Sequence, residues 1–287
     1  MEKETLENFE KAKEIYKKIE NFAKPLIKPG VKILDIAEQI ENKIKELGGK
    51  PAFPVNISID DIAAHYTPDV NENTILKEKN LVKIDIGVHV NGWIYDGAFS
   101  VFVGEKTHPL IEAAKKAVEA GTREAKAGVK ICDVSEVIEN VVKEFGFNVI
   151  RNLSGHRLDR FNLHAEPSIP NNKNKIDIEL EKNWIIAIEV FTTAGAGWVK
   201  DSRPILIFQY LQDKATRMHE ARKILEMSKK DFETLPFTKR WIKNISLLKM
   251  DLALNQLLEL EAIQAHPILK EESGAIVAQW EESIVVK

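Results

Sequence analysis

The sequence of 287 residues is poor in cysteine, and Cys132 is the only one. A single cysteine cannot form an internal disulfide, and it excludes metal sites built from several thiolates. The sequence also lacks an apolar run long enough to span a bilayer, and its first residues lack the apolar region of a secretory signal. These absences predict a cytoplasmic protein with no membrane partner.

An excess of charge of one sign is missing as well. Lys and Arg number 41 and Asp and Glu number 44, which gives a formal net charge of -3. Such a balance gives no reason to expect nucleic acid as a partner. The hydrophobic fraction of 44% and the charged fraction of 30% are typical of a globular protein, and the length allows one or two domains.

One stretch in the first half of the chain predicts a β-hairpin with two aspartates. Two apolar-rich runs flank Asn91-Gly92, and both of these residues tolerate the positive φ of a two-residue hairpin turn. With that turn, Asp85 lies opposite Ala98 and Asp96 lies opposite Gly87. The two aspartates then share one face of the hairpin, with Cα atoms roughly 7–8 Å apart. Carboxylates this close repel each other unless a cation neutralises them.

The hairpin alone leaves another interpretation open. Antiparallel sheets carry polar residues on exposed faces, so the two aspartates are equally compatible with a solvated surface hairpin. A β-bulge would also move one of them to the opposite face. The rest of the chain has to decide between a cation site and a surface hairpin.

Segments with helical and strand-like periodicity recur in the same order on both sides of the hairpin. Before it, we expect helices over 6–24 and 34–47, a strand over 55–59, and a loop or short helix over 60–68 that carries His65. After it, we expect helices over 109–126 and 133–145, the second capped by Asp133 with Glu136, and strands over 148–153 and 184–192. This order predicts an internal duplication with a cleft between its halves.

The composition of the sequence changes beyond residue 211. Residues 216–232 and 245–265 are helical and rich in Lys and Glu, whereas residues 274–286 have the apolar character of a strand that rejoins the main sheet. The predicted domains are therefore a catalytic unit formed by residues 1–210 and 268–287, and a helical insertion subdomain over 211–267.

Three further polar residues interrupt apolar, strand-like stretches. His156 is expected at the end of a strand, and Glu189 and Glu281 lie inside two others. Each alone has an ordinary explanation, such as an ion pair, a turn or exposure to solvent. Together with the two hairpin aspartates, they form an oxygen-rich set with one nitrogen, which suits a pair of divalent first-row ions. Two such ions roughly 3.5–4 Å apart can share and ionise a water for hydrolysis.

A series of short motifs, in order along almost the whole chain, carries a resemblance to a known family. The motifs are Pro51-Ala-Phe-Pro54, Ala63-Ala-His-Tyr-Thr-Pro68, the hairpin, Asn152-Leu-Ser-Gly-His156, Leu163-His-Ala165, Ala187-Ile-Glu189, Thr234-Leu-Pro-Phe237, Arg240-Trp241 and Ala278-Gln-Trp-Glu281. They resemble the type 2 methionine aminopeptidases, most of all the short archaeal form. The resemblance implies an α+β pita-bread fold with a small helical insertion.

The resemblance also implies roles for individual residues. The implied metal ligands are Asp85, Asp96, His156, Glu189 and Glu281. Asp96 and Glu281 would bridge two divalent ions, which could be Co, Mn, Fe or Zn, since all of these accept such ligands.

Five residues receive catalytic or substrate-binding roles from the same resemblance. His65 and His164 match the two catalytic histidines that do not bind metal; His65 would bond the scissile amide nitrogen and His164 the carbonyl oxygen. Glu189 would accept the proton of the attacking water. Phe53 and Leu163 would line the pocket for the methionine side chain.

The sequence departs from the family pattern around these residues. Gly97 stands where Thr is usual, so a hydroxyl near the ligands would be missing. Glu166 stands where Gly is usual and would raise the pKa of His164 or bias the substrate chosen. Val190 and Glu282-Ser283 are further departures. None of them removes a ligand.

The implied function is removal of the initiator methionine from nascent chains with a small second residue. The expected partners are nascent polypeptides whose N-terminal residue is Met. We expect a monomer that acts near the ribosome, and no nucleic-acid site is evident. Two alternatives remain: another pita-bread hydrolase such as an Xaa-Pro dipeptidase, and a non-catalytic pita-bread binding protein. The first normally has a large N-terminal domain, and relatives of the second kind have lost ligands that this sequence retains.

Overall fold

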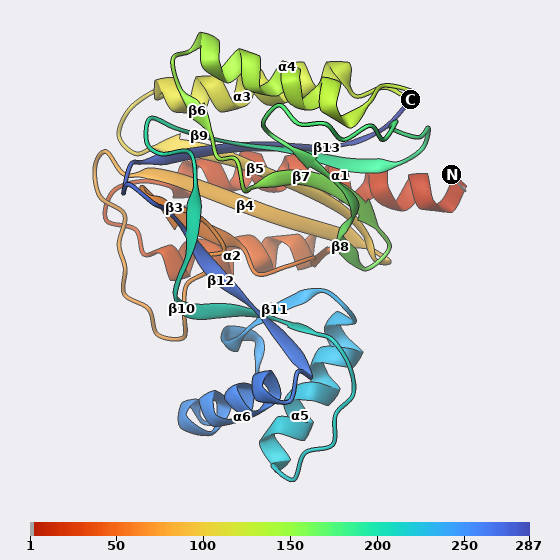
Figure 1. Ribbon diagram of the computed structural model, residues 1–287. Coiled ribbons are helices and arrows are strands. Elements are labelled where there is room, and N and C mark those ends of the chain that lie inside the picture. The colour runs from red at the N-terminus through yellow and green to blue at the C-terminus, as the bar shows by residue number, and fades with distance from the viewer. Residues whose placement is uncertain (1–2) are drawn as a thin grey trace.

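The computed structural model describes residues 3–287. Its centre is a nine-stranded sheet in which β1-β4-β5-β13-β9-β7-β8 are neighbours, while β2 pairs with β4 and β6 pairs with β9 (Figure 1). The strands are β1 (Lys50–Pro51), β2 (Asn56–Ile59), β4 (Leu81–Val90), β5 (Trp93–Phe102), β6 (Asn148–Val149), β7 (Ser154–Asp159), β8 (Asn162–Pro170), β9 (Ile185–Thr193) and β13 (Val277–Val285). The C-terminal strand β13 lies between β5 and β9 and so joins the two halves, which confirms that this segment rejoins the main sheet.

The hairpin formed by β4 and β5 has the predicted register. Asp85 pairs with Ala98 and Gly87 pairs with Asp96. Asn91 and Gly92 have φ values of 51° and 87°, so the turn needs the left-handed conformation that Asn and Gly adopt most easily. No bulge interrupts the paired residues of β4 and β5, so the two aspartates share one face.

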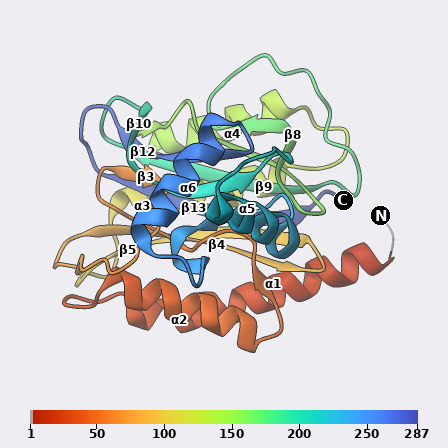
Figure 2. The ribbon, with the colours of Figure 1, turned by 90° about the horizontal axis from the view of Figure 1, so that it is seen from below.

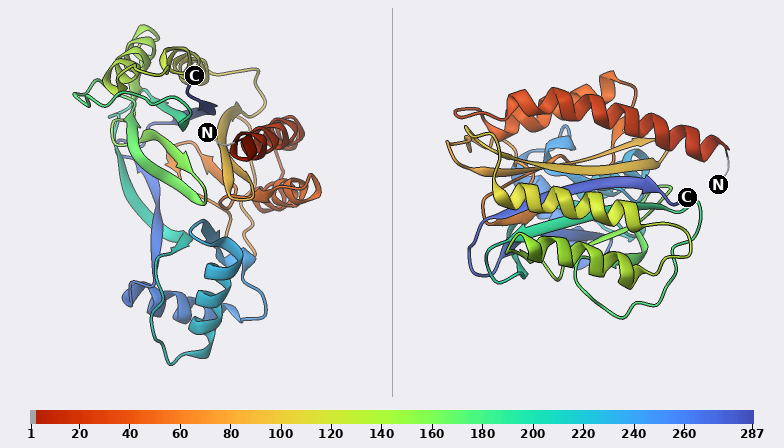
Figure 3. Two further views of the ribbon diagram at one scale, coloured as in Figure 1. Left: turned by 90° about the vertical axis from the view of Figure 1, so that its right-hand side faces the viewer. Right: turned by 90° about the horizontal axis from the view of Figure 1, so that it is seen from above.

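Four helices cover one face of the main sheet in two pairs (Figures 1 and 3). The helices are α1 (Lys3–Ala23), α2 (Ile33–Glu46), α3 (Pro109–Glu124) and α4 (Ile131–Glu144). Apolar residues at helical spacing face the sheet and are almost fully buried, for example Ile15 and Ile19 in α1 and Val134 and Ile138 in α4. Helix, helix and then strands occur twice, as the sequence predicted, and the opposite face of the sheet stays free for a cleft.

A second sheet of four strands borders that cleft, in the order β11-β10-β12-β3. Its strands are β3 (Ile62–Ala64), β10 (Val199–Tyr210), β11 (Pro236–Thr238) and β12 (Ile263–Glu271). Between β10 and β12 the chain forms α5 (His219–Met227), a π-helical turn (Ser228–Phe232) and α6 (Leu247–Glu259), which project from the sheets and are nearest the viewer in Figure 2. These helices share an apolar core with strands of the second sheet, which contributes Phe208, Phe237 and Ile263.

A buried ion pair anchors the insertion to α2. Arg240 donates to both carboxylate oxygens of Glu41, at 2.9 and 2.7 Å, and to Pro68 O at 2.8 Å. The indole nitrogen of Trp241 donates to the same carboxylate at 2.8 Å. Both charged side chains are only 4% exposed, so each charge is neutralised by the other and not by water.

Several local predictions differ from the structure. The segment predicted as a loop or short helix over 60–68 contains β3, which pairs with β12 more than two hundred residues away. Asp133 lies within the first turn of α4, whose N-cap is Lys130 without a side-chain cap, so the predicted capping box is wrong. His156 lies inside β7 rather than at a strand end, and the strand predicted over 148–153 covers only two residues.

The C-terminal end of the predicted helical insertion also differs from the structure. Residues 263–265, predicted as helical, begin β12 because they pair with β10. The boundary of the insertion at 211–267 stays a prediction. None of the helices within residues 3–287 combines the length and apolarity needed to cross a bilayer.

Candidate metal centre and cleft

A row of side chains crosses four strands of the main sheet. In register, Asp85 of β4 lies beside Ala98 of β5, Ala98 beside Glu281 of β13, and Glu281 beside Glu189 of β9. Cross-strand partners point to the same face of a sheet, and Asp96 shares that face because it is two residues from Ala98. The three carboxylates of the row and Asp96 therefore converge on the cleft face.

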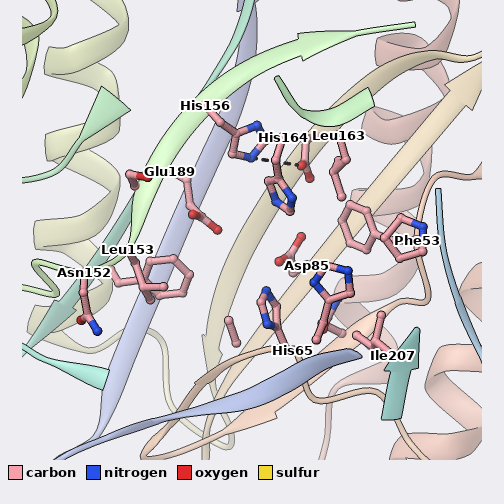
Figure 4. Close-up of a pocket in the computed structure, with 17 residues that line it drawn as sticks. Phe53, His65, Asp85, Asn152, Leu153, His156, Leu163, His164, Glu189 and Ile207 are labelled. Atoms are coloured by element: carbon pink, nitrogen blue, oxygen red, sulfur yellow. Dashed lines mark ion pairs between the residues drawn. The ribbon is translucent and has the colours of Figure 1, made fainter. Parts of the chain in front are cut away.

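His156 completes this group from β7. Its Nε2 lies 3.8 Å from Asp96 Oδ2, as the dashed line in Figure 4 marks. Two triads have potential ligand atoms within 4.8 Å of one another: Asp96, His156 and Glu281, and Asp85, Glu189 and Glu281. Glu281 belongs to both triads, which suits a ligand shared between two ions, whereas Asp96 belongs to one.

The pKa values of all four carboxylates are raised. Burial raises the pKa of Asp85 to about 7. Burial and then the charges of neighbouring carboxylates raise the pKa values of Asp96, Glu189 and Glu281 well above the usual range. Among the described residues, Asp85 Oδ1, Asp96 Oδ1 and Glu281 Oε1 are buried without a hydrogen-bond donor. Three buried acceptor oxygens without a donor fit divalent cations, and burial lowers the pKa of His156 to about 4, leaving a neutral imidazole ligand.

Gln279 orients two of these carboxylates. Its Nε2 donates to Asp85 Oδ2 at 3.3 Å and to Glu189 Oε1 at 3.0 Å. Ser283 does the same for the backbone of Asp96, because its hydroxyl accepts from Asp96 N at 3.0 Å and donates to Asp96 O at 2.7 Å. The sequence analysis did not assign a role to Gln279, although its place two residues before Glu281 puts it on the same face of β13.

A cavity of about 310 Å³ opens over this centre between the two sheets (Figure 4). The residues predicted for substrate binding all line it: Phe53, His65, Leu163 and His164. Asn152, Ile207, Pro236 and His266 also line it, and the sequence analysis missed them. Asn152 and Pro236 lie within motifs that carry the resemblance, but no role was assigned to them. Ile207, Pro236 and His266 reach the cleft through the second sheet.

His65 is held in a defined orientation just after β3. Its φ is 63°, and its Nδ1 lies 3.1 Å from Pro267 O. A carbonyl oxygen only accepts, so Nδ1 carries the proton and Nε2 is left as an acceptor. Burial lowers the pKa of His65, which keeps this tautomer uncharged at neutral pH.

His164 differs from the expectation based on Glu166. The ring of His164 lies edge-on to His156 with centroids 4.6 Å apart. Although His164 is exposed to the cleft, desolvation and then the neighbouring histidines lower its pKa well below 6.5. Glu166 does not raise that pKa; it is exposed, and its carboxylate accepts from Ser168 N at 3.2 Å.

The other departures from the family pattern lie mostly behind the sheet. A Cβ at Gly97 would point at Tyr16 of α1, away from the carboxylates, so a threonine hydroxyl there would not reach them. Val190 is fully buried in the core under α3 and α4. Glu282 lines a small cavity beside α1 with Lys13. Only Ser283 contacts the backbone of a predicted ligand.

Comparison with known proteins gives the family. The model of metallopeptidase family M24 matches residues 7–287. The chain belongs to metallopeptidase family M24. A methionine aminopeptidase of Thermococcus kodakarensis is 47% identical over 279 residues, which cover 96% of this chain and 95% of that protein. The predicted family is thereby confirmed, and membership of M24 implies the use of divalent metal.

Solved structures agree with this assignment. A structure of a thermophilic Arx1 has a TM-score of 0.88 at 18% identity and covers 99% of this chain and 88% of that one, which shows the fold alone. A prolidase from Pyrococcus furiosus has a TM-score of 0.59 at 25% identity but covers only 66% of this chain and 56% of its own. The α+β pita-bread fold of the M24 family is therefore confirmed, and the prolidase matches only part of each chain.

Proposed function

We propose that this M24 protein removes the N-terminal methionine from nascent polypeptides by hydrolysis that depends on two divalent ions. The observation that carries the proposal is the convergence of five side chains at one cleft: Asp85, Asp96, His156, Glu189 and Glu281. The mutual repulsion of the buried carboxylates, and the three of their oxygens that have no donor among residues 3–287, support a pair of cations as their partners.

The ions would supply Lewis acidity toward the scissile carbonyl and lower the pKa of the attacking water. The ligands would be divided between the two triads, with Glu281 common to both. Asp96 is proposed as the second bridging ligand on the resemblance alone. The choice among Co, Mn, Fe and Zn is left open by this ligand set.

The other cleft residues act on the peptide. Glu189 takes the proton from the attacking water and gives it to the leaving amide nitrogen as the C–N bond breaks. Nε2 of His65 is free and accepts a hydrogen bond from the N–H of the scissile amide. His164 binds the carbonyl oxygen as negative charge develops there. Both histidines stay neutral near pH 7, so neither competes with the cations for the carboxylates.

Phe53 and Leu163 form the apolar slot for the methionine side chain. They are 5% and 6% exposed and lie at the same end of the cavity. A thioether needs no hydrogen bond and fits an aromatic and aliphatic lining. The preference for a small second residue is proposed on the resemblance alone.

A peptide assay tests the proposal. The purified protein with Mn²⁺ or Co²⁺ is expected to release methionine from Met-Ala-Ser and to leave an Xaa-Pro dipeptide intact. Turnover of the Xaa-Pro dipeptide alone would identify a dipeptidase. No turnover with any divalent metal in a folded sample would favour the non-catalytic binding protein.

The cellular setting follows from this substrate. Nascent chains and a lone cysteine both suit the cytoplasm, so we propose action there, as a monomer and without a nucleic-acid or membrane partner. Proximity to the ribosome stays a prediction.

A further inference from the structure

His266 of β12 lines the cleft and has no role in the mechanism above. Its ring lies edge-on to that of His65, with centroids 5.8 Å apart and an interplanar angle of 84°. His266 pairs across strands with Ile207 of β10, so both side chains point from the second sheet into the same cavity. This wall faces the metal centre and borders the position of the scissile amide at His65.

A hydrogen-bond network determines which nitrogen of His266 carries the proton. Gln209 Nε2 donates to Thr234 O at 2.6 Å, and a backbone carbonyl only accepts, so the amide of Gln209 has one orientation. Its Oε1 then accepts from Gln264 Nε2 at 2.6 Å and lies 2.8 Å from His266 Nε2. Because that oxygen is an acceptor, the hydrogen of His266 is on Nε2.

The other ring nitrogen is therefore a free acceptor. Burial, and then the neighbouring His65, lower the pKa of His266 to about 4, so the ring is neutral near pH 7. Nδ1 of His266 has no hydrogen-bond partner within residues 3–287, and solvent can reach it. A peptide substrate in the cleft has backbone N–H groups beyond the scissile bond, and each of them loses water on binding.

We propose that His266 Nδ1 accepts a hydrogen bond from a backbone N–H of the substrate, within two residues after the scissile amide, and that Gln209 maintains the tautomer required for this bond. The inference rests on the proposed function and extends it to substrate residues beyond the second. The 5.8 Å between the rings of His65 and His266 is comparable to the rise of two residues in an extended peptide, roughly 6.6 Å. An extended chain whose scissile N–H meets His65 thus reaches His266 with its next amides.

Replacement of single substrate amides by esters tests the hydrogen bond. Met-Ala-Ser-Ala would be compared with two analogues in which the N–H of residue 3 or of residue 4 is replaced by an ester oxygen. With the wild-type protein, one ester is expected to lower kcat/KM about 3- to 10-fold, as for loss of one neutral hydrogen bond. In His266→Phe, which keeps an aromatic ring against His65 but lacks Nδ1, the ratio of amide to ester is expected to fall close to one. An unchanged ratio in His266→Phe would overturn the proposal.

The tautomer has a readout that needs neither metal nor turnover. Nitrogen NMR of the histidine rings in the metal-free protein is expected to show His266 protonated at Nε2 only, and Gln209→Leu is expected to give a mixture of tautomers. A wild-type spectrum with the proton on Nδ1 would contradict the proposal. If the wild-type protein failed to cleave even the all-amide peptide, the proposed function would fail, whereas the NMR result would still report separately on the state of His266.

Discussion

Glu281 of β13 lies directly opposite Glu189 of β9 in the antiparallel register. Two glutamates at paired positions repel each other, and here Asp85 lies in the same row beyond Ala98. The sheet therefore brings carboxylates together that destabilise it unless cations are bound. The first prediction follows from this relationship.

Without metal, the contribution of Asp85 to stability is expected to decrease as pH rises from about 4 to 7, whereas buried histidines such as His156, whose pKa is lowered, contribute in the opposite direction. Asp85 has an ordinary pKa of 3.8 and a folded-state value of about 7, so the folded protein holds a proton that the unfolded chain has already released. A folded pKa above the unfolded value gives stability that is present below the lower value and lost as pH rises through the higher one. Asp96, Glu189 and Glu281 have shifts in the same direction.

Thermal unfolding in EDTA between pH 4.5 and 7.5 measures this trend. Added Mn²⁺ is expected to raise Tm more at pH 7.5 than at pH 4.5, because protons compete with the ion for the carboxylates. The control is the same pH series on Asp85→Asn, in which Tm without metal should fall less, or rise more, with pH than in the wild type. An equal pH dependence of Tm in EDTA for the two proteins would contradict the electrostatic account.

His65→Ala is expected to keep its metal affinity. Its turnover is expected to fall by roughly 10²- to 10⁴-fold, as for the loss of a group that takes part in general acid–base catalysis. The reason is that His65 contacts Pro267 O and the cleft but belongs to neither carboxylate triad. Metal titration by calorimetry and kcat/KM on Met-Ala-Ser separate the two effects. His219→Ala, at an exposed position at the start of α5, serves as the matched control. Equal rates for both variants would remove His65 from the mechanism.

The hairpin and the second sheet show what could be predicted from sequence. The pairing of Asp85 with Ala98 follows from a two-residue turn and strict alternation, which are local rules, and it was correct. β3 and His266 were not predicted, because β3 has its strand partner in β12 and His266 depends on Gln209 in another strand. Their neighbours in the chain carry no periodic signal, and such long-range pairings decide where a short polar segment lies.

The ion pair of the insertion gives a prediction about stability. Arg240→Met is expected to lower the free energy of unfolding by about 3–5 kcal/mol, since it leaves the Glu41 carboxylate buried without its cation. The double variant Arg240→Met with Glu41→Gln is expected to be more stable than the single one, because no buried charge remains unpaired. Urea denaturation measures both. A double variant that is less stable than Arg240→Met would show that the pair is not the source of the loss.

Gly97 gives the last prediction, because the resemblance led us to expect Thr at this position. A Cβ there would lie 2.5 Å from Cζ of Tyr16, a buried ring that also contacts Tyr95 at 4.8 Å between centroids. Gly97→Thr is therefore expected to destabilise the protein by about 1–3 kcal/mol, through overpacking between α1 and β5 and without a direct contact to the carboxylates.

The partner residue supplies the control for this substitution. Tyr16→Leu removes the atoms that obstruct a side chain at position 97, so Gly97→Thr is expected to cost less in the Tyr16→Leu background than in the wild type. A double-mutant cycle measured by urea denaturation gives this coupling, and metal affinity should stay within a few-fold in every variant. If the two substitutions were additive, residue 97 would not be limited by Tyr16. If Gly97→Thr instead changed metal affinity by a large factor, residue 97 would act on the ligands through the sheet, and glycine at this position would then belong to the chemistry of the cleft.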